Sequence, residues 1–197
     1  MRYPPGHKEE TRKKILAAAS ALFRRQGTEA TGLPEVMKAA GMTVGGFYRH
    51  FDSKSELFRE AVRSSLHRSL AFLRHGPSHH RGRSWMRAAA ARYLSREHLE
   101  NVDHGCPLPS LTPEIGRADP QVRSAYAEAL REIIDELETR MPDDGELTPR
   151  EQAWAFMALN VGALMLARGT GDAEQAEEIL RACRRSAAPG WREDQPS

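Results

Sequence analysis

Apolar residues recur every three or four positions in the first part of the chain, between Lys8 and Gln26. This spacing places them on one face of an α-helix, with polar and charged residues on the other faces. Gly27 follows directly and is well placed to end such a helix. The residues of the apolar face are Ile15, Ala18, Ala19, Leu22 and Phe23.

Two shorter helical patterns come next. Apolar positions within residues 33–40 predict about two turns of helix, with Gly41 as the terminator. Thr43 is a candidate N-cap for a third helix that runs to about Phe51. Phe47 and Phe51 lie on the same face of that helix and are expected to be core residues.

A fourth helix and a boundary are expected further along. Residues 53–56, Ser-Lys-Ser-Glu, have the sequence of a capping box and predict a helix over residues 54–73. Residues 74–83, RHGPSHHRGR, combine glycine, proline and serine with basic side chains and show no apolar periodicity. Such a stretch is typical of a hinge or domain boundary.

The second half of the chain also has helical patterns. They cover residues 84–100 and 121–140, and a proline-rich broken stretch over 104–120 separates them. No strand pattern and no internal repeat is present in the sequence. The predicted fold class is therefore all-α.

Two C-terminal helices are expected to hold two copies of the chain together. A capping box at Thr148 opens a helix in which Asn160 is the only polar side chain within residues 153–167. A helix that is apolar on all sides must be buried, and this run is shorter than the roughly 20 residues that span a bilayer. Together with the amphipathic pattern over 173–187, it predicts a homodimer through helices at about 149–168 and 173–187. The alternative is that both helices complete a monomeric core.

The net charge of +2 hides an asymmetry along the chain. Residues 1–75 contain 14 Lys and Arg against 7 Asp and Glu, a balance of +7, whereas residues 76–197 contain 15 against 20, a balance of −5. This division suggests an N-terminal module that binds a polyanion, followed by a domain with another task. No apolar run long enough for a membrane span or a signal peptide is present, so no membrane partner is expected and the expected location is the cytoplasm.

Catalytic and metal-binding patterns are not found in the sequence. Cys106 and Cys183 are too few for a disulfide framework, and no Cys/His cluster has zinc-site spacing. His75 and His79 are separated by Gly76 and Pro77, which would break a helix between them. There is no glycine-rich phosphate loop, nucleophile elbow or zincin motif, and Asp103 and Glu114 have no evident partner. We therefore expect no enzyme activity, no metal and no cofactor.

The turn between the second and third helices suggests a helix-turn-helix. Gly41, Met42 and Thr43 form the short glycine-containing connection of that motif, whose second helix enters the DNA major groove. Gly45 and Gly46 each cost the third helix roughly 1 kcal/mol relative to alanine. Close approach of backbone to DNA would offset this cost, although close helix packing explains one of them equally well.

The run KKILAAASALFRRQGTEATGLPEVMKAAGMTVGGFYRHFDSKSELF resembles the DNA-binding domain of the tetracycline-repressor-like (TetR) family over about residues 10–60. The resemblance implies a homodimeric transcription factor, most often a repressor, that binds a palindromic operator and is released when its C-terminal domain binds a small molecule. It predicts a head over residues 1–53, a connecting helix over 54–73, and a regulatory domain for ligand binding and dimerisation over 74–197. A DNA-binding protein without any ligand is the alternative.

The resemblance also implies which residues touch DNA. For His50 the alternative is that it packs the third helix against the fourth. The implied phosphate contacts are Thr31, Thr43, Tyr48, His50 and Lys54, and the implied base-facing residues are Val44, Gly45, Gly46 and Arg49. Many family members carry lysine or another polar residue in place of Val44, and threonine in place of Gly46. Specificity is therefore expected to depend on Arg49, on apolar contact from Val44 and on DNA shape.

The regulatory domain has one further motif, GCPLPSL over residues 105–111, which is similar to a segment found in some branches of the family. Cys106 in it lies near the expected start of a helix, where a thiol pKa is lowered, and this suggests a sensor of electrophiles or oxidants. The simpler interpretation is a small residue in a pocket wall. The candidate pocket residues are Trp85, Tyr93, Leu94, Cys106, Leu108, Leu111, Tyr126, Leu130, Phe156 and Asn160. We expect coupling through a shift of the helix over residues 54–73.

Overall fold

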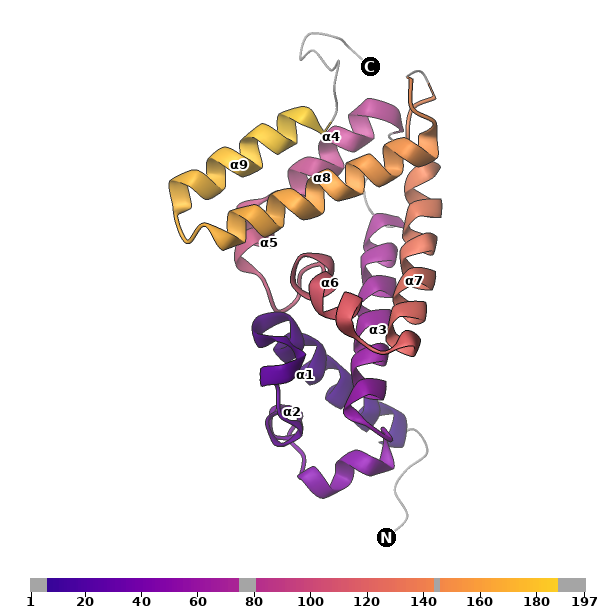
Figure 1. The fold of residues 1–197 in the computed structure, drawn as a ribbon, viewed down its shortest axis with the longest axis vertical. Helices are drawn as coiled ribbons and strands as arrows, with labels where there is room; N and C mark the ends of the chain where they lie inside the picture. The colour runs from indigo at the N-terminus through magenta and orange to yellow at the C-terminus, as the bar shows by residue number, and fades with distance from the viewer. Residues whose placement is uncertain (1–6, 75–80, 144–145, 188–197) are drawn as a thin grey trace. The chain divides into compact units, whose positions relative to one another are not determined.

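The computed structural model of the chain describes residues 7–74, 81–143 and 146–187. These residues form α-helices and one 3₁₀ helix and contain no strand, which confirms the all-α class (Figure 1). The chain divides into two compact units. Unit 1 comprises Met1–His67 and Val102–Ala129, and unit 2 comprises Arg68–Asn101 and Leu130–Ser197. The segment 102–129 thus folds with the N-terminal part of the chain, whereas the functional boundaries at 53 and 74 stay a prediction.

Unit 1 is built from the N-terminal helices and two later ones. Of the apolar face expected for the first helix, Ile15, Ala19 and Phe23 are buried in its core, whereas Ala18 and Leu22 are half-buried. Phe23 also makes an edge-to-face contact with Phe58, with ring centroids 5.4 Å apart. The elements of unit 1 are α1 (His7–Ala30), α2 (Leu33–Ala39), the 3₁₀ helix η1 (Val44–Arg49), most of α3 (Lys54–Arg74), α6 (Leu108–Arg117) and the first half of α7 (Pro120–Glu138).

Gly27 interrupts α1 where the sequence predicts a stop, although helical turns resume as far as Ala30. Its φ of 83° and ψ of 169° lie in a region that residues with a Cβ rarely adopt. A Cβ built at this position would collide with Oε1 of Glu114 on α6. The same carboxylate accepts hydrogen bonds from the Thr28 backbone N–H at 2.8 Å and the Thr28 hydroxyl at 2.6 Å. Glycine is thus required by the backbone conformation, and a side chain here would also displace the Glu114 carboxylate.

A second set of contacts attaches the segment before α6 to α1. The buried Arg24 guanidinium donates to the backbone carbonyls of Val102 at 3.2 Å and Asp103 at 2.9 Å, and to the Ser65 hydroxyl at 3.0 Å. Arg25 pairs with the Asp103 carboxylate, and this hydrogen bond lowers the pKa of Asp103 below its ordinary value. The expectation that Asp103 and Glu114 lack partners is therefore wrong. Both carboxylates hold unit 1 together.

Unit 2 contains the remaining helices. The single helix expected over residues 84–100 is interrupted at Leu94, because the Ser95 hydroxyl caps a new short helix by accepting from the His98 N–H at 3.1 Å. The capping box predicted at Thr148 is present, with reciprocal bonds between Thr148 and Glu151. The helices of unit 2 are α4 (Gly82–Tyr93), α5 (Arg96–Glu100), α8 (Pro149–Gly169), α9 (Ala173–Ser186) and the ends of α3 and α7.

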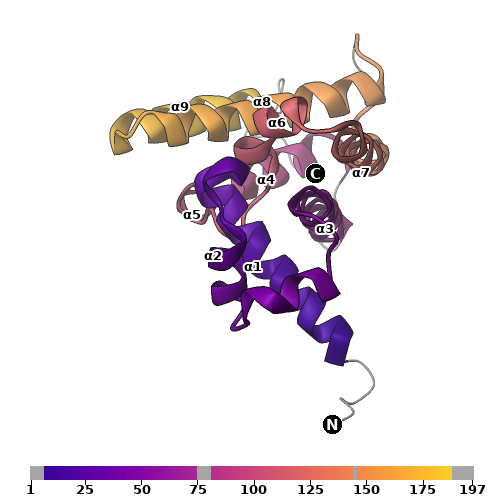
Figure 2. The same cartoon turned by 60° about the horizontal axis from the view of Figure 1, so that its bottom comes forward.

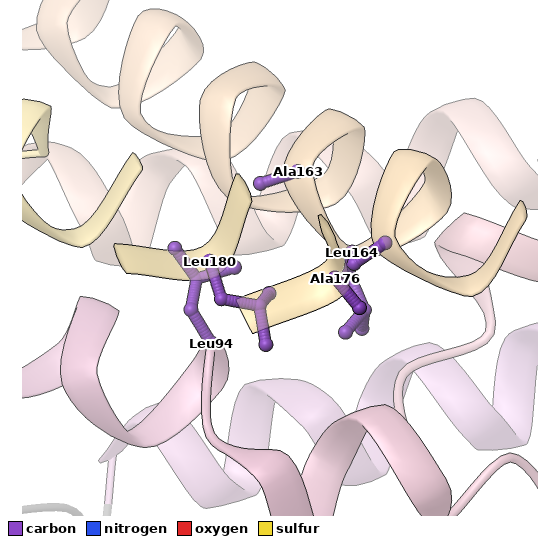
Figure 3. Close-up of a cluster of buried hydrophobic side chains, with 6 residues drawn as sticks. Leu94, Ala163, Leu164, Ala176 and Leu180 are labelled. Atoms are coloured by element: carbon purple, nitrogen blue, oxygen red, sulfur yellow. The ribbon is translucent and has the colours of Figure 1, made fainter. Parts of the chain in front are cut away.

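The core of unit 2 lies where α9 runs alongside α8 (Figure 2). Figure 3 shows Leu94, from the end of α4, beside Leu180 of α9. Arg184 of α9 donates to the Leu94 carbonyl at 2.7 Å, which satisfies a carbonyl at the end of α4. The buried cluster consists of Leu94, Ala163, Leu164, Ala167, Ala176 and Leu180.

Some expectations fall outside the described residues. Positions 75–80, which include His75, His79 and most of the expected hinge, are among them. So is the C-terminal tail over 189–197, for which the sequence suggests disorder.

Candidate nucleic-acid interface

The turn of the helix-turn-helix is closed by hydrogen bonds that require a glycine. Gly41 has φ of 73°, and its N–H donates to the Lys38 carbonyl at 3.0 Å. The Met42 N–H donates to the Met37 carbonyl at 2.8 Å. This pair of bonds, with a left-handed residue just after the helix, is a Schellman motif. It ends α2 and turns the chain towards η1.

The predicted third helix is a six-residue 3₁₀ helix, η1, and not an α-helix from Thr43 to Phe51. Thr43 occupies the N-cap with extended backbone, but its side chain makes no capping hydrogen bond. Gly45 and Gly46 lower the helix propensity of the segment, and 3₁₀ geometry is typical of short helices with weak bonding. We call η1 the recognition element, after its place in the motif.

Two aromatic side chains anchor the recognition element. Phe47 is 0% exposed and Phe51 is 1% exposed, and their rings stack with centroids 5.8 Å apart. This confirms the prediction that both are core residues. Tyr48, between them in sequence, is 68% exposed. Its ring meets the Phe47 ring edge-on, with centroids 5.2 Å apart. The element thus has one buried aromatic face and one open face.

The open face contains most of the residues expected to meet DNA. Thr43, Val44, Gly45, Tyr48 and Arg49 are exposed, and Gly46, His50 and Lys54 are half-buried. In the described part of the chain, neither Arg49 nor Lys54 is engaged in an ion pair. Their positive charges therefore remain available to an anionic partner.

The two glycines of this face are not explained by packing. A Cβ at Gly45 would meet nothing within 4 Å, and one at Gly46 would make an ordinary contact with Met37 at 3.8 Å. Of the two explanations left open by the sequence, close helix packing therefore loses its support. Close approach by an external partner remains.

Thr31 departs from the expectation of a phosphate contact. It is 0% exposed, and its hydroxyl donates to the Gly27 carbonyl at 2.6 Å. Its position in the turn between α1 and α2 gives it a structural role.

The start of α3 follows the predicted capping pattern with one change. The Glu56 N–H donates to the Ser53 hydroxyl at 3.0 Å, as expected. The Glu56 carboxylate, however, accepts from the Asp52 N–H at 2.6 Å. Lys54 is the first residue of α3, so its ammonium lies at a helix N-terminus, where backbone N–H groups favour an anion.

The candidate pocket residues divide between the two compact units. Cys106, Leu108, Leu111 and Tyr126 belong to unit 1, and the other six belong to unit 2. Within unit 2, the rings of Trp85 and Phe156 lie 5.8 Å apart at their centroids. Asn160, one turn after Phe156 on α8, is buried, and its amide N–H donates to the Phe156 carbonyl at 2.7 Å. Leu94 belongs to the hydrophobic cluster, and Tyr93 packs against that cluster.

The two cysteines are half-buried thiols that are not joined in a disulfide. Cys106 lies two positions before α6, whose N-cap is Pro107. In the described residues no group of three histidine, cysteine or acidic side chains is suited to a metal ion. None of the helices in the described ranges is long and apolar enough to cross a membrane.

The geometry of α2, the glycine turn and η1 defines a helix-turn-helix protein, and comparison with known proteins identifies its family. Residues 15–61 match the family described as bacterial regulatory proteins of the tetR family. Residues 82–183 match the tetracyclin repressor-like C-terminal domain. The chain belongs to the TetR family of DNA-binding transcriptional regulators.

Curated relatives support this assignment. The chain is 52% identical over 52 residues to the transcriptional regulator AcrR of Shigella flexneri, a match that spans 26% of this chain and only 24% of that protein. It is 34% identical over 73 residues to the regulator YfiR of Bacillus subtilis, a match that spans 36% of that protein. A longer match, 28% identical over 183 residues, covers 87% of this chain and 90% of the transcriptional repressor NemR of Escherichia coli.

Solved structures of the same fold agree. The reduced form of E. coli NemR superposes with a TM-score of 0.75 at 23% identity, covering 88% of this chain and 95% of that chain. A TetR-family regulator from Cytophaga hutchinsonii superposes with a TM-score of 0.80 at 17% identity, covering 98% of this chain and 100% of that chain. At these identities the likeness shows the fold.

Proposed function

We propose that the protein is a ligand-responsive repressor that binds a palindromic operator as a homodimer and is released by a small molecule. The observation that carries this proposal is the open face of the recognition element. There Val44, Tyr48 and Arg49 are exposed beside two glycines that packing does not require. Such a face suits insertion into the major groove of a duplex.

The chemistry of the exposed side chains divides their roles. The Tyr48 hydroxyl, the Thr43 hydroxyl and the Lys54 ammonium are donors for phosphate oxygens, and they fix the register of the protein on DNA. Arg49 is the side chain suited to a bidentate contact with guanine, and Val44 to an apolar contact with a thymine methyl group. Gly45 and Gly46 let the backbone approach base edges. His50, half-buried at the end of η1, is also assigned a phosphate contact.

Dimerisation through α8 is supported by apolar side chains on its exposed side. Trp154 is 43% exposed and Met165 is 39% exposed, and the exposed Ala158 lies between them at helical spacing. The buried stripe of α8, which includes Phe156 and Leu164, packs within unit 2. A helix with apolar residues on both sides therefore has one side left for a second copy.

The exposed charges of α9 favour an antiparallel arrangement of the two copies. The first half of the helix exposes Glu174, Glu177 and Glu178, and the second half exposes Arg181 and Arg185. In a two-fold symmetric dimer, residue i of one copy meets residue j of the other and the reverse. Antiparallel α9 helices would thus bring each acidic half against a basic half.

The test of DNA binding is a comparison of two DNA duplexes. The first is a duplex that the wild-type protein selects from a random library, and the second is a scrambled duplex of the same length. Replacing Arg49 with alanine should weaken binding to the selected duplex by about 10- to 100-fold, and binding to the scrambled duplex much less. Lys54→Ala should weaken binding to both duplexes about equally, and it should reduce the salt dependence of binding by about one released counterion. Equal losses for Arg49→Ala on the two duplexes would contradict its assignment to bases.

The effector is assigned to the helical core of the regulatory part, near Trp85, Phe156 and Asn160. An apolar aromatic surface with a few oriented polar groups is the usual composition of a small-molecule site. Thermal unfolding against a panel of metabolites, followed by release of the selected duplex, tests this assignment. A compound that raises the unfolding temperature and lowers DNA affinity would support it. If no compound does both, the DNA-binding protein without a ligand becomes the better account.

A second candidate function is sensing through Cys106. The relative NemR is named a repressor, and its solved structure is described as a reduced form. In this chain Cys106 leads into α6, and α6 contacts the Gly27 break of α1 through Glu114. N-ethylmaleimide, to which the Cys106 thiol adds, should release the selected duplex from the wild-type protein and from the Cys183→Ser variant. It should not release the duplex from the Cys106→Ser variant. Unchanged affinity after complete alkylation of Cys106 would exclude this function.

A further inference from the structure

The recognition element has little stability of its own. It is a six-residue 3₁₀ helix with two glycines and no side-chain bond at its N-cap. Helical segments of this kind do not persist without contacts from the rest of the protein. Phe47 and Phe51 anchor its buried face, but aromatic packing supplies no hydrogen-bond donor to the carbonyl of His50 at its end. The orientation of its open face must therefore depend on a polar contact as well.

Arg12 of α1 makes that contact. Its guanidinium Nη1 donates a hydrogen bond to the backbone carbonyl of His50, the C-cap residue of η1. The guanidinium carbon also lies 4.1 Å from the centroid of the Phe51 ring. A cation at the C-terminal end of a helix satisfies its last carbonyls and is stabilised by the helix dipole.

The same guanidinium reaches the beginning of α3. Its Nη2 lies 3.7 Å from the Glu56 carboxylate and 3.8 Å from the Glu60 carboxylate. These two side chains are 22% and 19% exposed, and that of Arg12 is 34% exposed. One side chain thus connects α1, the end of η1 and the first two turns of α3.

We propose that Arg12 is a positioning residue for DNA recognition, which fixes the end of the recognition element without itself contacting DNA. This inference rests on the proposed role of η1 as the DNA-reading segment. Arg12 would act in two ways. It holds the His50 carbonyl, and it offsets two carboxylates that would otherwise repel phosphates from the same surface.

Arginine is required for this arrangement, since lysine cannot reproduce it. The guanidinium carbon lies over the Phe51 ring while Nη1 donates to the His50 carbonyl and Nη2 faces the carboxylates. A lysine ammonium supplies a charge at one point and no planar face. A variant with lysine at this position therefore separates the charge from the geometry.

The experiment compares Arg12→Ala and Arg12→Lys with the matched control Lys13→Ala. Lys13 is the next residue on α1, is 72% exposed, and pairs only with Glu9 across one turn among the described residues. Its removal deletes the same charge without touching η1. Affinity is measured for the duplex that the wild-type protein selects and for its scrambled version, at a temperature at which each variant is fully folded by circular dichroism.

Arg12→Ala should weaken binding to the selected duplex by about 10- to 100-fold, and binding to the scrambled duplex no more than Lys13→Ala does. Arg12→Lys should restore the affinity for the scrambled duplex, but it should not restore the affinity for the selected duplex. A residue that only stabilises the fold would lower the unfolding temperature without changing the ratio of the two affinities. The proposal is overturned if that ratio is unchanged in Arg12→Ala or is restored in Arg12→Lys.

A second measurement requires no DNA. Hydrogen–deuterium exchange of the free protein should be faster over residues 43–51 in Arg12→Lys than in the wild type, with α2 unchanged. Unaltered exchange in that segment would also overturn the proposal. If the wild-type protein selects no duplex at all, the proposed function fails, while the exchange measurement still decides whether Arg12 holds the recognition element.

Discussion

The recognition element and α8 both present side chains to an expected partner, but they differ in how their backbones are held. The recognition element has six residues and no side-chain bond at its N-cap, and it depends on Phe47 and Arg12. In contrast, α8 has 21 residues and begins with a complete capping box. Its exposed residues include Trp154 and Met165, whereas the recognition element exposes Tyr48 and Arg49 among others.

This difference fits the partner that each surface is proposed to meet. A backbone that approaches base edges closely needs small residues, which suits the two glycines of η1, and their low helix propensity leaves its rigidity to neighbouring helices. A helix that packs against another protein contributes area, so it can be long, apolar and stable by its own caps. Mutations should therefore affect the two surfaces in different ways.

The largest effect is expected at the aromatic anchor of the recognition element. Phe47→Ala should lower the free energy of unfolding by about 3–5 kcal/mol, because it removes a fully buried ring from the core of unit 1. The adjacent Tyr48→Ala should change it by no more than about 0.5 kcal/mol, since that ring is exposed. Chemical denaturation followed by circular dichroism measures both. Similar losses of unfolding free energy for the two variants would mean that the Tyr48 ring is buried and does not belong to an open face.

The next effect concerns the apolar side of α8. Met165→Glu places a charge in the expected dimer interface and should weaken dimerisation by about 100-fold or more, because an unpaired buried charge costs several kcal/mol. The control is Ala127→Glu, which puts the same charge on an exposed position of α7. Sedimentation equilibrium gives the dissociation constants. A dimer that tolerates Met165→Glu would place the interface elsewhere.

Two threonines at N-caps give a finer comparison. Thr148→Ala should lower the free energy of unfolding by about 1 kcal/mol, because the Thr148 side chain bonds to the Glu151 backbone. Thr43→Ala should leave stability nearly unchanged, since the Thr43 hydroxyl makes no capping bond, but it should weaken DNA binding. Thermal unfolding and DNA titration of both variants test the contrast. A stability loss at Thr43 equal to that at Thr148 would contradict it.

The smallest effect is expected on the stability that the capping box of α8 loses at low pH. Hydrogen bonds from Thr148 lower the pKa of the Glu151 carboxyl below its ordinary value of 4.5. The charged carboxylate therefore contributes stability above the unfolded-state pKa, and this contribution is lost as the pH falls through the folded-state pKa. Replacing Glu151 with glutamine should slightly reduce the difference in unfolding free energy between pH 7 and pH 3. The recognition element has no acidic residue in its first turn, so it has no corresponding capping carboxylate.

Features that depend on local sequence were predictable. The break at Gly27, the capping box at Thr148 and the burial of Phe47 follow from spacing and residue type, and the structure contains all three. The all-α class and the family were also predictable, because the helix-turn-helix motif is local. The DNA contacts stay predictions, and the burial of Thr31 shows the limit of carrying a residue over from a family pattern.

Features that depend on distant residues were not predictable. The Glu114 carboxylate meets Thr28 from 86 positions away, and the Asp103 carboxylate meets Arg25 from 78 positions away. Nothing in the spacing of either carboxylate indicates which residue it will face. The 3₁₀ geometry of η1 also escaped prediction, since its pattern of apolar residues fits an α-helix as well.

The hydrogen bonds of Arg24 set a condition for building hybrid regulators. Grafting residues 1–74 onto the effector domain of another protein would remove the Val102 and Asp103 carbonyls and the Glu114 carboxylate from the end of α1. A buried guanidinium would then lose two of its acceptors. A portable version of this head therefore has to include residues 102–129, and a simple cut at the hinge would yield a fusion whose first helix is poorly held.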